Sequence, residues 1–282
     1  MTPASVLETA RAGGLLAPGE PLLVMLSGGA DSVCLLDVAV ELGAAATALH
    51  VNYGLREEAA EDERHCRAVC AGLGVEISVE RVALPRRGNL QALARDTRYE
   101  IAERVATGDY AAGHTASDQA ETVLYRLAAS PGRRALLGMR PRRGRLVRPL
   151  LGVTREQTHD HCRERGLEWR EDSSNSDPRF ARARVRHDLL PALRSLNPAA
   201  ERVIAETALV LREESELLDS VVESALERLG GGPAVELAAL AELPPALSRL
   251  TLREPAQRAA GEPLTLSRAD TGGILALGGP GG

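Results

Sequence analysis

The residues with the clearest chemical potential lie between Leu22 and Ser32, where an apolar stretch runs into Ser-Gly-Gly-Ala-Asp-Ser. The apolar stretch predicts a buried strand, and the residues after it predict a helix. Gly28 and Gly29 allow a phosphate to approach the backbone closely, and the free N–H groups at a helix start attract anions. The segment therefore predicts a phosphate-binding turn, with a ligand-free strand–helix turn as the alternative.

Asp31 follows the two glycines but would itself repel a phosphate. Its position therefore indicates a metal ligand, since a bound cation could bridge the carboxylate to the phosphates. The loop is not of the Walker type, because Gly-x-x-x-x-Gly-Lys-Ser/Thr is absent and the chain contains no lysine. Any positively charged side chain at the site must be an arginine or a histidine.

A second polar segment, Gly113–Thr122, contains two carboxylates three residues apart at an expected helix start. This spacing puts Asp118 and Glu121 on one face of the helix, where they could share one Mg²⁺ with Asp31. A capping box with Asp118 as N-cap and Glu121 three residues later is the alternative, and it does not exclude metal binding. His50, after another expected strand, either borders a nucleotide or is a core histidine bonded to the backbone.

The elements that must position these residues alternate along the first half of the chain. Such repeated βα units predict an α/β fold, a parallel sheet with helices on both faces. The loops after Leu26, Val51 and Ala112 should then share the edge where ligands bind. Strands are expected at Pro21–Leu26, Ala44–Val51, Val75–Val82 and Tyr110–Ala112, and helices at Asp31–Leu42, Glu57–Leu73, Leu90–Ala106 (N-cap Asn89) and Asp118–Ala129.

The second half changes character. Helices are expected at Glu156–Arg165, with Thr154 as N-cap, and at Arg182–Leu193 and Ala199–Leu229. Gly230–Pro233 ends the last helix, and no element is expected beyond it. These patterns divide the chain into a catalytic domain, 1–200, and a region 201–282 made of a long helix and a short C-terminal part.

An arginine-rich stretch interrupts the pattern between Ser130 and Pro149 and contains no acidic residue. Because the net charge of the chain is −5, nucleic acid could be bound only through a local patch of this kind. A solvated loop, an RNA phosphate contact and a segment ordered by substrate are the three interpretations. The arginines are Arg133, Arg134, Arg140, Arg142, Arg143, Arg145 and Arg148.

The cysteines and the hydropathy of the chain indicate its cellular compartment. The four cysteines form no Cys-x-x-Cys pair and do not resemble a disulfide framework, which fits a reducing cytosol. The N-terminus lacks a basic region followed by an apolar stretch, and no apolar run is long enough to span a bilayer. We therefore expect a cytoplasmic protein that does not contact membranes.

The segments in order resemble the tRNA(Ile)-lysidine synthetase family of the PP-loop ATP pyrophosphatase superfamily. The phosphate turn indicates only the superfamily, and the later segments in combination select the family. The resemblance covers about residues 20 to 200. It rests on Ser27–Ser32, His50–Arg56, Asn89-x-Gln91-Ala92-x-Ala94-Arg95, Gly113–Thr122, Gly138-Met139, Arg148-Pro149-Leu150-Leu151, Glu171-Asp172-Ser173-Ser174-Asn175-x-Asp177 and Arg182-x-x-x-Arg186.

The resemblance implies an adenine nucleotide α-hydrolase-like domain that uses ATP and Mg²⁺. ATP adenylates the O2 of the wobble cytidine in an isoleucine tRNA with a CAU anticodon, and free L-lysine then displaces AMP to form lysidine. The implied ATP-binding residues are Ser27, Gly28, Gly29, Ala30, Asp31, Ser32, His50, Gly113 and His114. The implied catalytic residues are Asp31, Asp118, Glu121, Arg182 and Arg186, with the three carboxylates as metal ligands, and tRNA contact is expected from Arg133, Arg134, Arg140, Arg142 and Arg143.

The chain departs from the family pattern at two positions of the site. Ser117 stands where the family usually has an acidic residue, and Ala183 stands where it usually has Asn. Many bacterial members also carry a longer C-terminal region that binds tRNA, and the short C-terminal part of region 201–282 is expected to be the tRNA-binding region here. The alternatives are another PP-loop adenylating enzyme, such as a tRNA thiolation enzyme, and an inactive RNA-binding relative. A homodimer is compatible with the sequence, which leaves the oligomeric state open.

Overall fold

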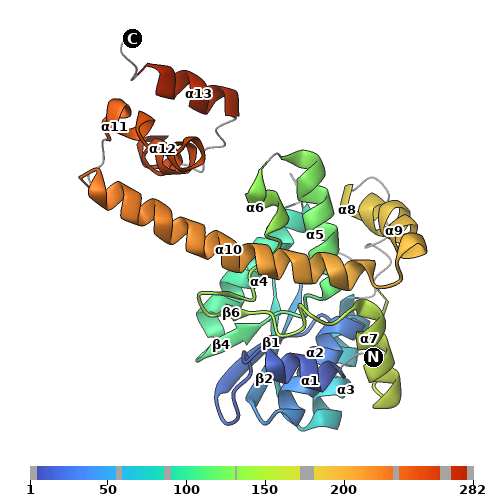
Figure 1. Cartoon of the computed structure of the whole chain (residues 1–282). Coiled ribbons are helices and arrows are strands. Elements are labelled where there is room, and N and C mark those ends of the chain that lie inside the picture. The colour runs from blue at the N-terminus through green and yellow to red at the C-terminus, as the bar shows by residue number, and fades with distance from the viewer. Residues whose placement is uncertain are drawn as a thin grey trace. The chain divides into compact units, whose positions relative to one another are not determined.

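The computed structural model describes residues 5–54, 59–85, 90–130, 132–171, 181–230, 235–260 and 268–277. The chain divides into two compact units, Met1–Ala208 and Leu209–Gly282. The division falls within the long helix α10 (Ala200–Arg228) (Figure 1). We describe the two units separately.

Unit 1 is built on a six-stranded sheet with the order β3-β2-β1-β4-β6-β5. Neighbouring strands are parallel except β5 and β6, which are antiparallel. The first strand therefore has β2 on one side and β4 on the other, a switch point of the kind where open α/β sheets bind ligands. The strands are β1 (Pro21–Met25), β2 (Ala45–Asn52), β3 (Glu76–Arg81), β4 (Asp109–Ala111), β5 (Arg142–Arg143) and β6 (Leu146–Val147).

Helices pack on both faces of this sheet, which confirms the predicted α/β class. Alternate residues of β1 enter two separate cores, because successive side chains of a strand point to opposite faces. Leu22 and Val24 pack with α1, α2, α3 and α7, whereas Leu23 and Met25 pack with α4. These helices are α1 (Val6–Ala12), α2 (Ala30–Glu41), α3 (Ala59–Leu73), α4 (Leu90–Val105) and α7 (Arg155–Glu164). The expected start of α3 and the expected cap Asn89 lie outside the described residues.

The arginine-rich stretch contains more structure than the sequence predicts. After α5 (Ala116–Ala129) the chain forms a short helix, α6 (Arg133–Leu136), and then the β5–β6 hairpin, which extends the sheet by two strands. The hairpin turns at Gly144, whose φ of 58° favours glycine. Only two consecutive apolar residues, Leu146 and Val147, are buried in it. A two-residue strand is too short to be recognised from periodicity.

The single helix expected over Arg182–Leu193 is wrong in detail. The structure has α8 (Ala181–Arg184), a π-helical turn η2 (Val185–Leu189) and α9 (Leu190–Leu196). Pro191 lacks a backbone N–H and cannot continue the regular hydrogen-bond ladder. The Leu190 N–H instead donates to the carbonyl of Val185, the longer-range bond of a π turn. The element that carries Arg182 and Arg186 is therefore irregular, and Pro191 is the feature of the sequence that signals it.

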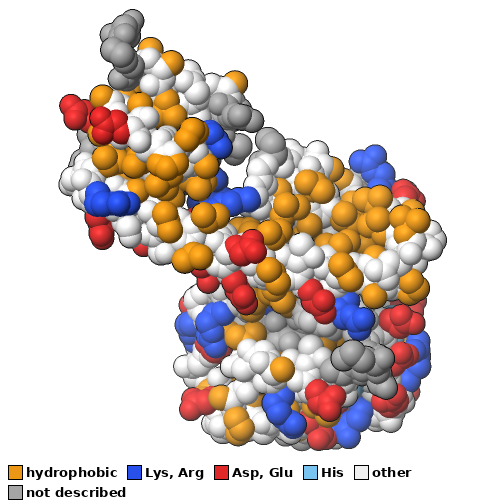
Figure 2. All heavy atoms as spheres, viewed as in Figure 1, with side chains coloured by type: hydrophobic (Ala, Val, Ile, Leu, Met, Phe, Trp, Pro, Cys, Tyr) orange, Lys and Arg blue, Asp and Glu red, His pale blue; other side chains and the backbone are white. Residues whose placement is uncertain are grey.

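Unit 2 contains the remainder of α10 and three helices where none was predicted. They are α11 (Leu237–Ala241), α12 (Pro245–Ala260) and α13 (Arg268–Ala276). The prediction of no element beyond Gly230 is therefore wrong, because the short apolar segments here are helical despite their Gly and Pro content. Both units expose apolar side chains on the face shown in Figure 2. Among the described helices, none is both long and apolar enough to cross a membrane.

Candidate active site

The phosphate turn lies at the carboxyl end of β1, where the sequence places it. The Ser27 N–H donates to the Ser32 hydroxyl at 3.2 Å, and the Ser32 hydroxyl donates to the Gly29 carbonyl at 2.9 Å. Gly28 has a φ of 88°, and a Cβ there would lie 3.3 Å from His65 and from Cys66. The backbone conformation and the limited space explain why glycine is required at this turn.

Gly113, at the end of β4, packs directly against the backbone of Asp31. A Cβ at Gly113 would lie 2.8 Å from the Asp31 carbonyl oxygen. We expect Gly113→Ala to destabilise the protein by roughly 1–3 kcal/mol and to slow ATP cleavage, because the start of α2 must move. Gly72→Ala is the matched control, since nothing lies within 4 Å of a Cβ there. Denaturant unfolding and ATP turnover of both variants test this expectation, and equal stability of the two would contradict it.

Asp31 is oriented by α7. The Thr158 hydroxyl donates to one carboxylate oxygen at 2.5 Å, and the Arg155 Nε lies 3.6 Å from the other. Helix α7 is itself fixed on α2, because the buried Asp37 accepts from His161 at 2.7 Å and from Arg165 at 3.2 Å. The contact between α2 and α7 thus fixes where Arg155 and Thr158 stand relative to the phosphate turn.

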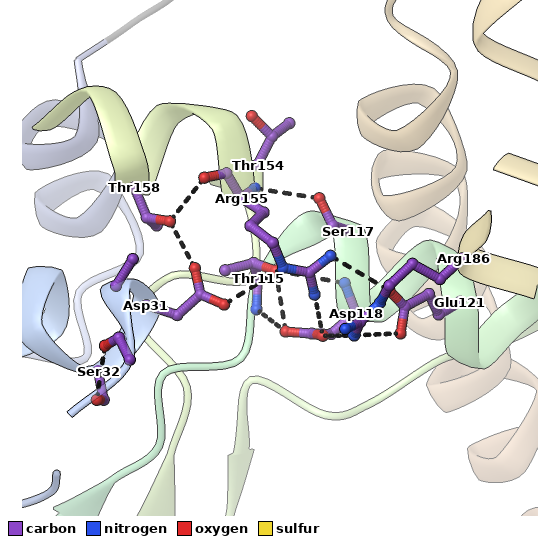
Figure 3. A network of polar contacts seen from close by, with 12 residues as sticks. Asp31, Ser32, Thr115, Ser117, Asp118, Glu121, Thr154, Arg155, Thr158 and Arg186 are labelled. Carbon is purple, nitrogen blue, oxygen red and sulfur yellow. Dashed lines mark hydrogen bonds and ion pairs between the residues drawn. The ribbon is translucent and has the colours of Figure 1, made fainter. Parts of the chain in front are cut away.

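Arg155 connects Asp31 to the two carboxylates of α5 (Figure 3). Its Nη2 lies 2.8 Å from an Asp118 oxygen, and its Nη1 lies 3.3 Å from Glu121 Oε1. Arg186, from η2, donates to both Glu121 oxygens at 2.6 and 3.0 Å and lies 3.7 Å from Asp118. The predicted site residues Asp31, Asp118, Glu121 and Arg186 are therefore brought together. Arg182 lies close by and donates to the Thr122 hydroxyl at 3.1 Å.

The capping box of α5 is displaced from the predicted one. Thr115, not Asp118, is the N-cap residue, and its hydroxyl accepts from the Asp118 N–H. Asp118 occupies the third helical position and accepts from the Thr115 N–H at 2.9 Å. The Thr115-x-x-Asp118 pair satisfies the exposed donors at the helix start. Glu121 takes no part in the cap and remains available to the arginines.

The electrostatics differ between the two aspartates. Burial and the negative charge of Asp118 raise the pKa of Asp31 above its ordinary value. Burial would also raise the pKa of Asp118, but Arg155, His114 and the Thr115 hydrogen bonds outweigh it and hold that pKa low. Asp31 is therefore the carboxylate with the least positive charge beside it.

The expectation that Asp31, Asp118 and Glu121 together hold one Mg²⁺ stays a prediction. Within the described part of the chain, no group of three or more His, Cys, Asp or Glu side chains is arranged to hold a metal ion. The physical reason is the position of Arg155, whose guanidinium stands among the three carboxylates. Both Glu121 oxygens are also occupied by arginine.

The two histidines of the predicted site differ in their surroundings. His50 is buried, and its Nδ1 lies 3.0 Å from the Leu26 carbonyl and 3.3 Å from Cys66. This matches the core-histidine interpretation. His114 accepts a hydrogen bond on Nδ1 from Arg148 at 3.2 Å, so its ring proton is on Nε2.

Burial lowers the pKa of His114 from 6.5 to about 4. Because the unfolded chain takes up the proton first, the neutral ring favours folding fully above pH 6.5, and this contribution is lost as the pH falls toward 4. We expect His114→Gln, which can still accept from Arg148, to show a smaller loss of stability over this interval. Urea unfolding between pH 4.5 and 7 measures it, and identical slopes for the two proteins would contradict the assignment.

Ser117, which stands where the resembled family usually has an acidic residue, is hydrogen-bonded to a carboxylate from another helix. Its hydroxyl donates to the buried Glu201 carboxylate at 2.8 Å and accepts from the backbone N–H of Arg155 at 3.1 Å. The other oxygen of Glu201 pairs with Arg194 at 2.5 Å. A carboxylate from α10 thus reaches the position where the resembled family usually carries its own. Ala183, the other departure, is buried and makes no polar side-chain contact by its chemistry.

This arrangement predicts the effect of restoring the acidic residue. Ser117→Asp would put two carboxylates within hydrogen-bond reach in a buried place, and we expect a loss of about 1–3 kcal/mol of stability. Adding Glu201→Gln should recover most of it, because the amide can donate to the new carboxylate. Denaturant unfolding of the single and double variants tests both steps. A fully stable Ser117→Asp protein would contradict the pairing.

The five arginines expected to contact tRNA differ in exposure and in their partners. Arg142 pairs with Asp109 at 2.7 Å and lines a cavity of about 390 Å³ at the amino ends of β1 and β4, away from the phosphate turn. Arg134, Arg140 and Arg143 are exposed, whereas Arg133 is partly buried. Gln119 anchors the stretch, since it bonds the N–H and carbonyl of Met139 at 2.5 and 3.0 Å.

Sequence reasoning missed Arg155, Thr158, Thr115 and Glu201. Thr154 was correctly predicted as the cap of α7, and its side chain accepts from the Gln157 N–H. The capping signal identifies the helix start but not the direction in which Arg155 points. Only the packing of α7 on α2 brings Arg155 and Thr158 to the site.

Comparison with known proteins agrees with this architecture. Residues 7–193 match the PP-loop domain family. The U34-tRNA thiolase NcsA from Methanococcus maripaludis superposes with a TM-score of 0.63 at 18% identity, over 74% of this chain and 78% of that chain. At this identity the likeness shows a shared fold.

Two named relatives are much more similar in sequence. The tRNA(Ile)-lysidine synthase of Thermobifida fusca is 40% identical over 265 residues, which is 89% of this chain and 82% of that protein. The tRNA(Ile)-lysidine synthase of Mycolicibacterium paratuberculosis is 42% identical over 236 residues, 83% of this chain and 73% of that protein. The match to the PP-loop family over residues 7–193 includes the phosphate turn, the Asp118–Glu121 segment and the helices that carry Arg155 and Arg186. With these two relatives, it shows that the chain belongs to the tRNA(Ile)-lysidine synthase family of PP-loop proteins.

Proposed function

We propose that this protein converts the wobble cytidine of the CAU-anticodon isoleucine tRNA to lysidine. The cytidine O2 attacks the α-phosphorus of ATP, and pyrophosphate leaves. The side-chain amine of free L-lysine then attacks C2 and expels AMP, so that one C–N bond replaces the C–O bond. The observation that carries the proposal is the phosphate turn at the end of β1 lying beside the Asp118–Glu121 face of α5 within one ion-pair network.

The phosphate turn accounts for the first step. The Gly28–Gly29 backbone and the start of α2 offer N–H groups to the triphosphate. Because the chain has no lysine, arginines must neutralise the charge that develops on pyrophosphate. Arg155 and Arg186 are the charged side chains at the cluster, and both have planar guanidinium groups suited to phosphate oxygens.

The donor chemistry fits Mg²⁺ at two of the three carboxylates. Asp31 and Asp118 offer the hard oxygen ligands that Mg²⁺ prefers, and Arg155 lies farther from Asp31, at 3.6 Å, than from Asp118, at 2.8 Å. We assign the metal to these two residues and not to Glu121, which holds Arg155 and Arg186. When bound, the ion supplies charge neutralisation on the leaving pyrophosphate.

The second step needs a proton acceptor and a splayed base. The lysine ammonium must lose a proton before it attacks, and a carboxylate of this cluster is the acceptor we propose. The wobble base must leave the anticodon stack to be reached. Exposed Arg134, Arg140 and Arg143 are the candidates for anticodon phosphate contact, because Arg142 is held by Asp109.

The thiolation alternative receives less support. The likeness to a tRNA thiolase is one of fold, and the four free cysteines of this chain are all buried. Cys34, the one nearest in sequence to Asp31, has no exposed surface, and the hydrogen bond that its thiol donates to Cys162, together with burial, raises its pKa far above the ordinary value. Neutral buried thiols are poor nucleophiles. Free buried thiols also fit the cytoplasm, where we place the reaction.

The products of ATP cleavage test the proposal. With α-labelled ATP, L-lysine and a transcript of the isoleucine tRNA, we expect AMP and pyrophosphate, and far less of either with the CAU-anticodon methionine tRNA. Formation of ADP, or AMP at the same rate without tRNA, would contradict it.

A further inference from the structure

The guanidinium of Arg155 lies among the carboxylates of Asp31, Asp118 and Glu121, in the place that a bound metal ion would take. Its guanidinium approaches Asp31, Asp118 and Glu121 at 3.6, 2.8 and 3.3 Å. It is largely buried, with 24% of its side chain exposed. A cation on a long side chain thus stands among the hard oxygen ligands that suit a divalent metal.

The neighbouring arginine does not share this position. Arg186 is engaged with both oxygens of Glu121 and is 3.7 Å from Asp118. Asp31 forms an ion pair with Arg155, whereas the ion pairs of Arg186 are with Glu121 and Asp118. Arg155 is therefore the cation that separates Asp31 from Asp118.

We propose that Arg155 is the built-in counter-ion of this site, and that it excludes a divalent cation until ATP is bound. The inference deepens the proposed function, since it gives the binding order of the metal at the ATP site. The Asp31 contact is the longest of the three and the easiest to lose. Without nucleotide, a metal ion entering beside the guanidinium would meet a like charge at short range.

ATP changes this balance because its triphosphate brings additional negative charge to the turn beside Asp31. The site can then hold a metal ion and a guanidinium together, each with anionic partners. Before ATP binds, Arg155 keeps the two aspartates in place, and with ATP bound the same guanidinium is available to the phosphate oxygens. Its removal should convert the cluster into an open pair of carboxylates.

Manganese binding without nucleotide tests the proposal. We would follow free Mn²⁺ by electron paramagnetic resonance in the full-length wild type, Arg155→Gln and Arg163→Gln. Arg163 lies on the same helix in an exposed pair with Asp160, so it is the matched control. We expect Arg155→Gln to bind one Mn²⁺ at least tenfold more tightly than the other two proteins, and Asp31→Asn in the same background to abolish the gain. Equal affinities in all three would overturn the proposal.

A second measurement uses the wild type alone and so does not depend on the folding of a variant. We expect Mn²⁺ to bind at the site only when the non-cleavable α,β-methylene analogue of ATP is present. Tight Mn²⁺ binding to the nucleotide-free wild type would overturn the proposal. Neither titration contains tRNA or lysine, so failure here is distinct from failure of the proposed reaction.

Discussion

Replacing Asp31 with Asn is expected to lower ATP-dependent pyrophosphate release by at least about 100-fold, a typical cost of losing one electrostatic group at a reacting centre. Asn can still accept the Thr158 hydroxyl bond that orients the residue. It cannot supply the negative charge that faces Arg155 or a metal ion. The loss should therefore appear in the chemical step, with circular dichroism and the unfolding transition close to those of the wild type.

Asp109→Asn is the matched control for this variant. Asp109 is a carboxylate in an arginine pair, with Arg142, but it lies at the amino end of β4 and not at the phosphate turn. We expect its pyrophosphate release to stay within about twofold of the wild type, since exposed pairs contribute little. Equal activity of Asp31→Asn and Asp109→Asn would remove Asp31 from the catalytic site.

Replacing Glu121 with Ala is expected to damage both stability and activity. Its side chain is 5% exposed and holds two guanidinium groups, so truncation removes the nearest anion of Arg186 and leaves both arginines to share Asp118. Breaking a buried pair in this way costs roughly 3–5 kcal/mol, which corresponds to a fall in Tm of about 10 °C. Thermal unfolding followed by circular dichroism measures the change.

A double-mutant cycle separates this effect from general damage. Arg186→Gln combined with Glu121→Gln should cost clearly less than the sum of the two single changes, because each single change leaves one charge unpaired. Exposed Arg184→Gln, on the same irregular helical segment, is the control and should add independently to Glu121→Gln. Strict additivity of Arg186 and Glu121 would mean that their contact carries little energy.

Much of the sheet and of the phosphate turn could be predicted from the sequence. The buried strands, Gly28, and the helix after Asp31 each carry a strong local signal, and their bounds in the structure differ from the expected ones by only one or two residues. Because ligands bind beyond the carboxyl ends of parallel strands, the sequence also predicted that Asp31, Asp118 and Glu121 lie near one another. The strands and helices follow from the local periodicity of apolar residues, and their alternation along the chain predicts the parallel sheet.

The contacts that arrange the site could not be predicted in the same way. Arg155 and Thr158 are polar residues of an ordinary capped helix, and the direction in which they point depends on how α7 packs against α2. Glu201 reaches Ser117 across 84 positions of the chain. Spacing alone predicts that the three carboxylates lie near one another, but it does not show that Arg155 contacts all of them.

These positions also show how the site couples stability to function. Arg155 and Arg186 are held by the carboxylates, so the charges that we propose act on pyrophosphate have a fixed place. Variants of the carboxylates should therefore disturb the arginines as well. Stability and activity need to be measured together for each of them.

The mass of the isoleucine tRNA after reaction tests the central claim most directly. We would incubate the full chain with ATP, Mg²⁺, L-lysine and the transcript, digest the tRNA, and measure by mass spectrometry the mass of the fragment that contains the wobble base. The account predicts a gain equal to lysine minus water on that cytidine, and no gain when lysine or ATP is omitted. An unmodified cytidine together with vigorous tRNA-dependent pyrophosphate release would contradict it and indicate a nucleophile other than lysine.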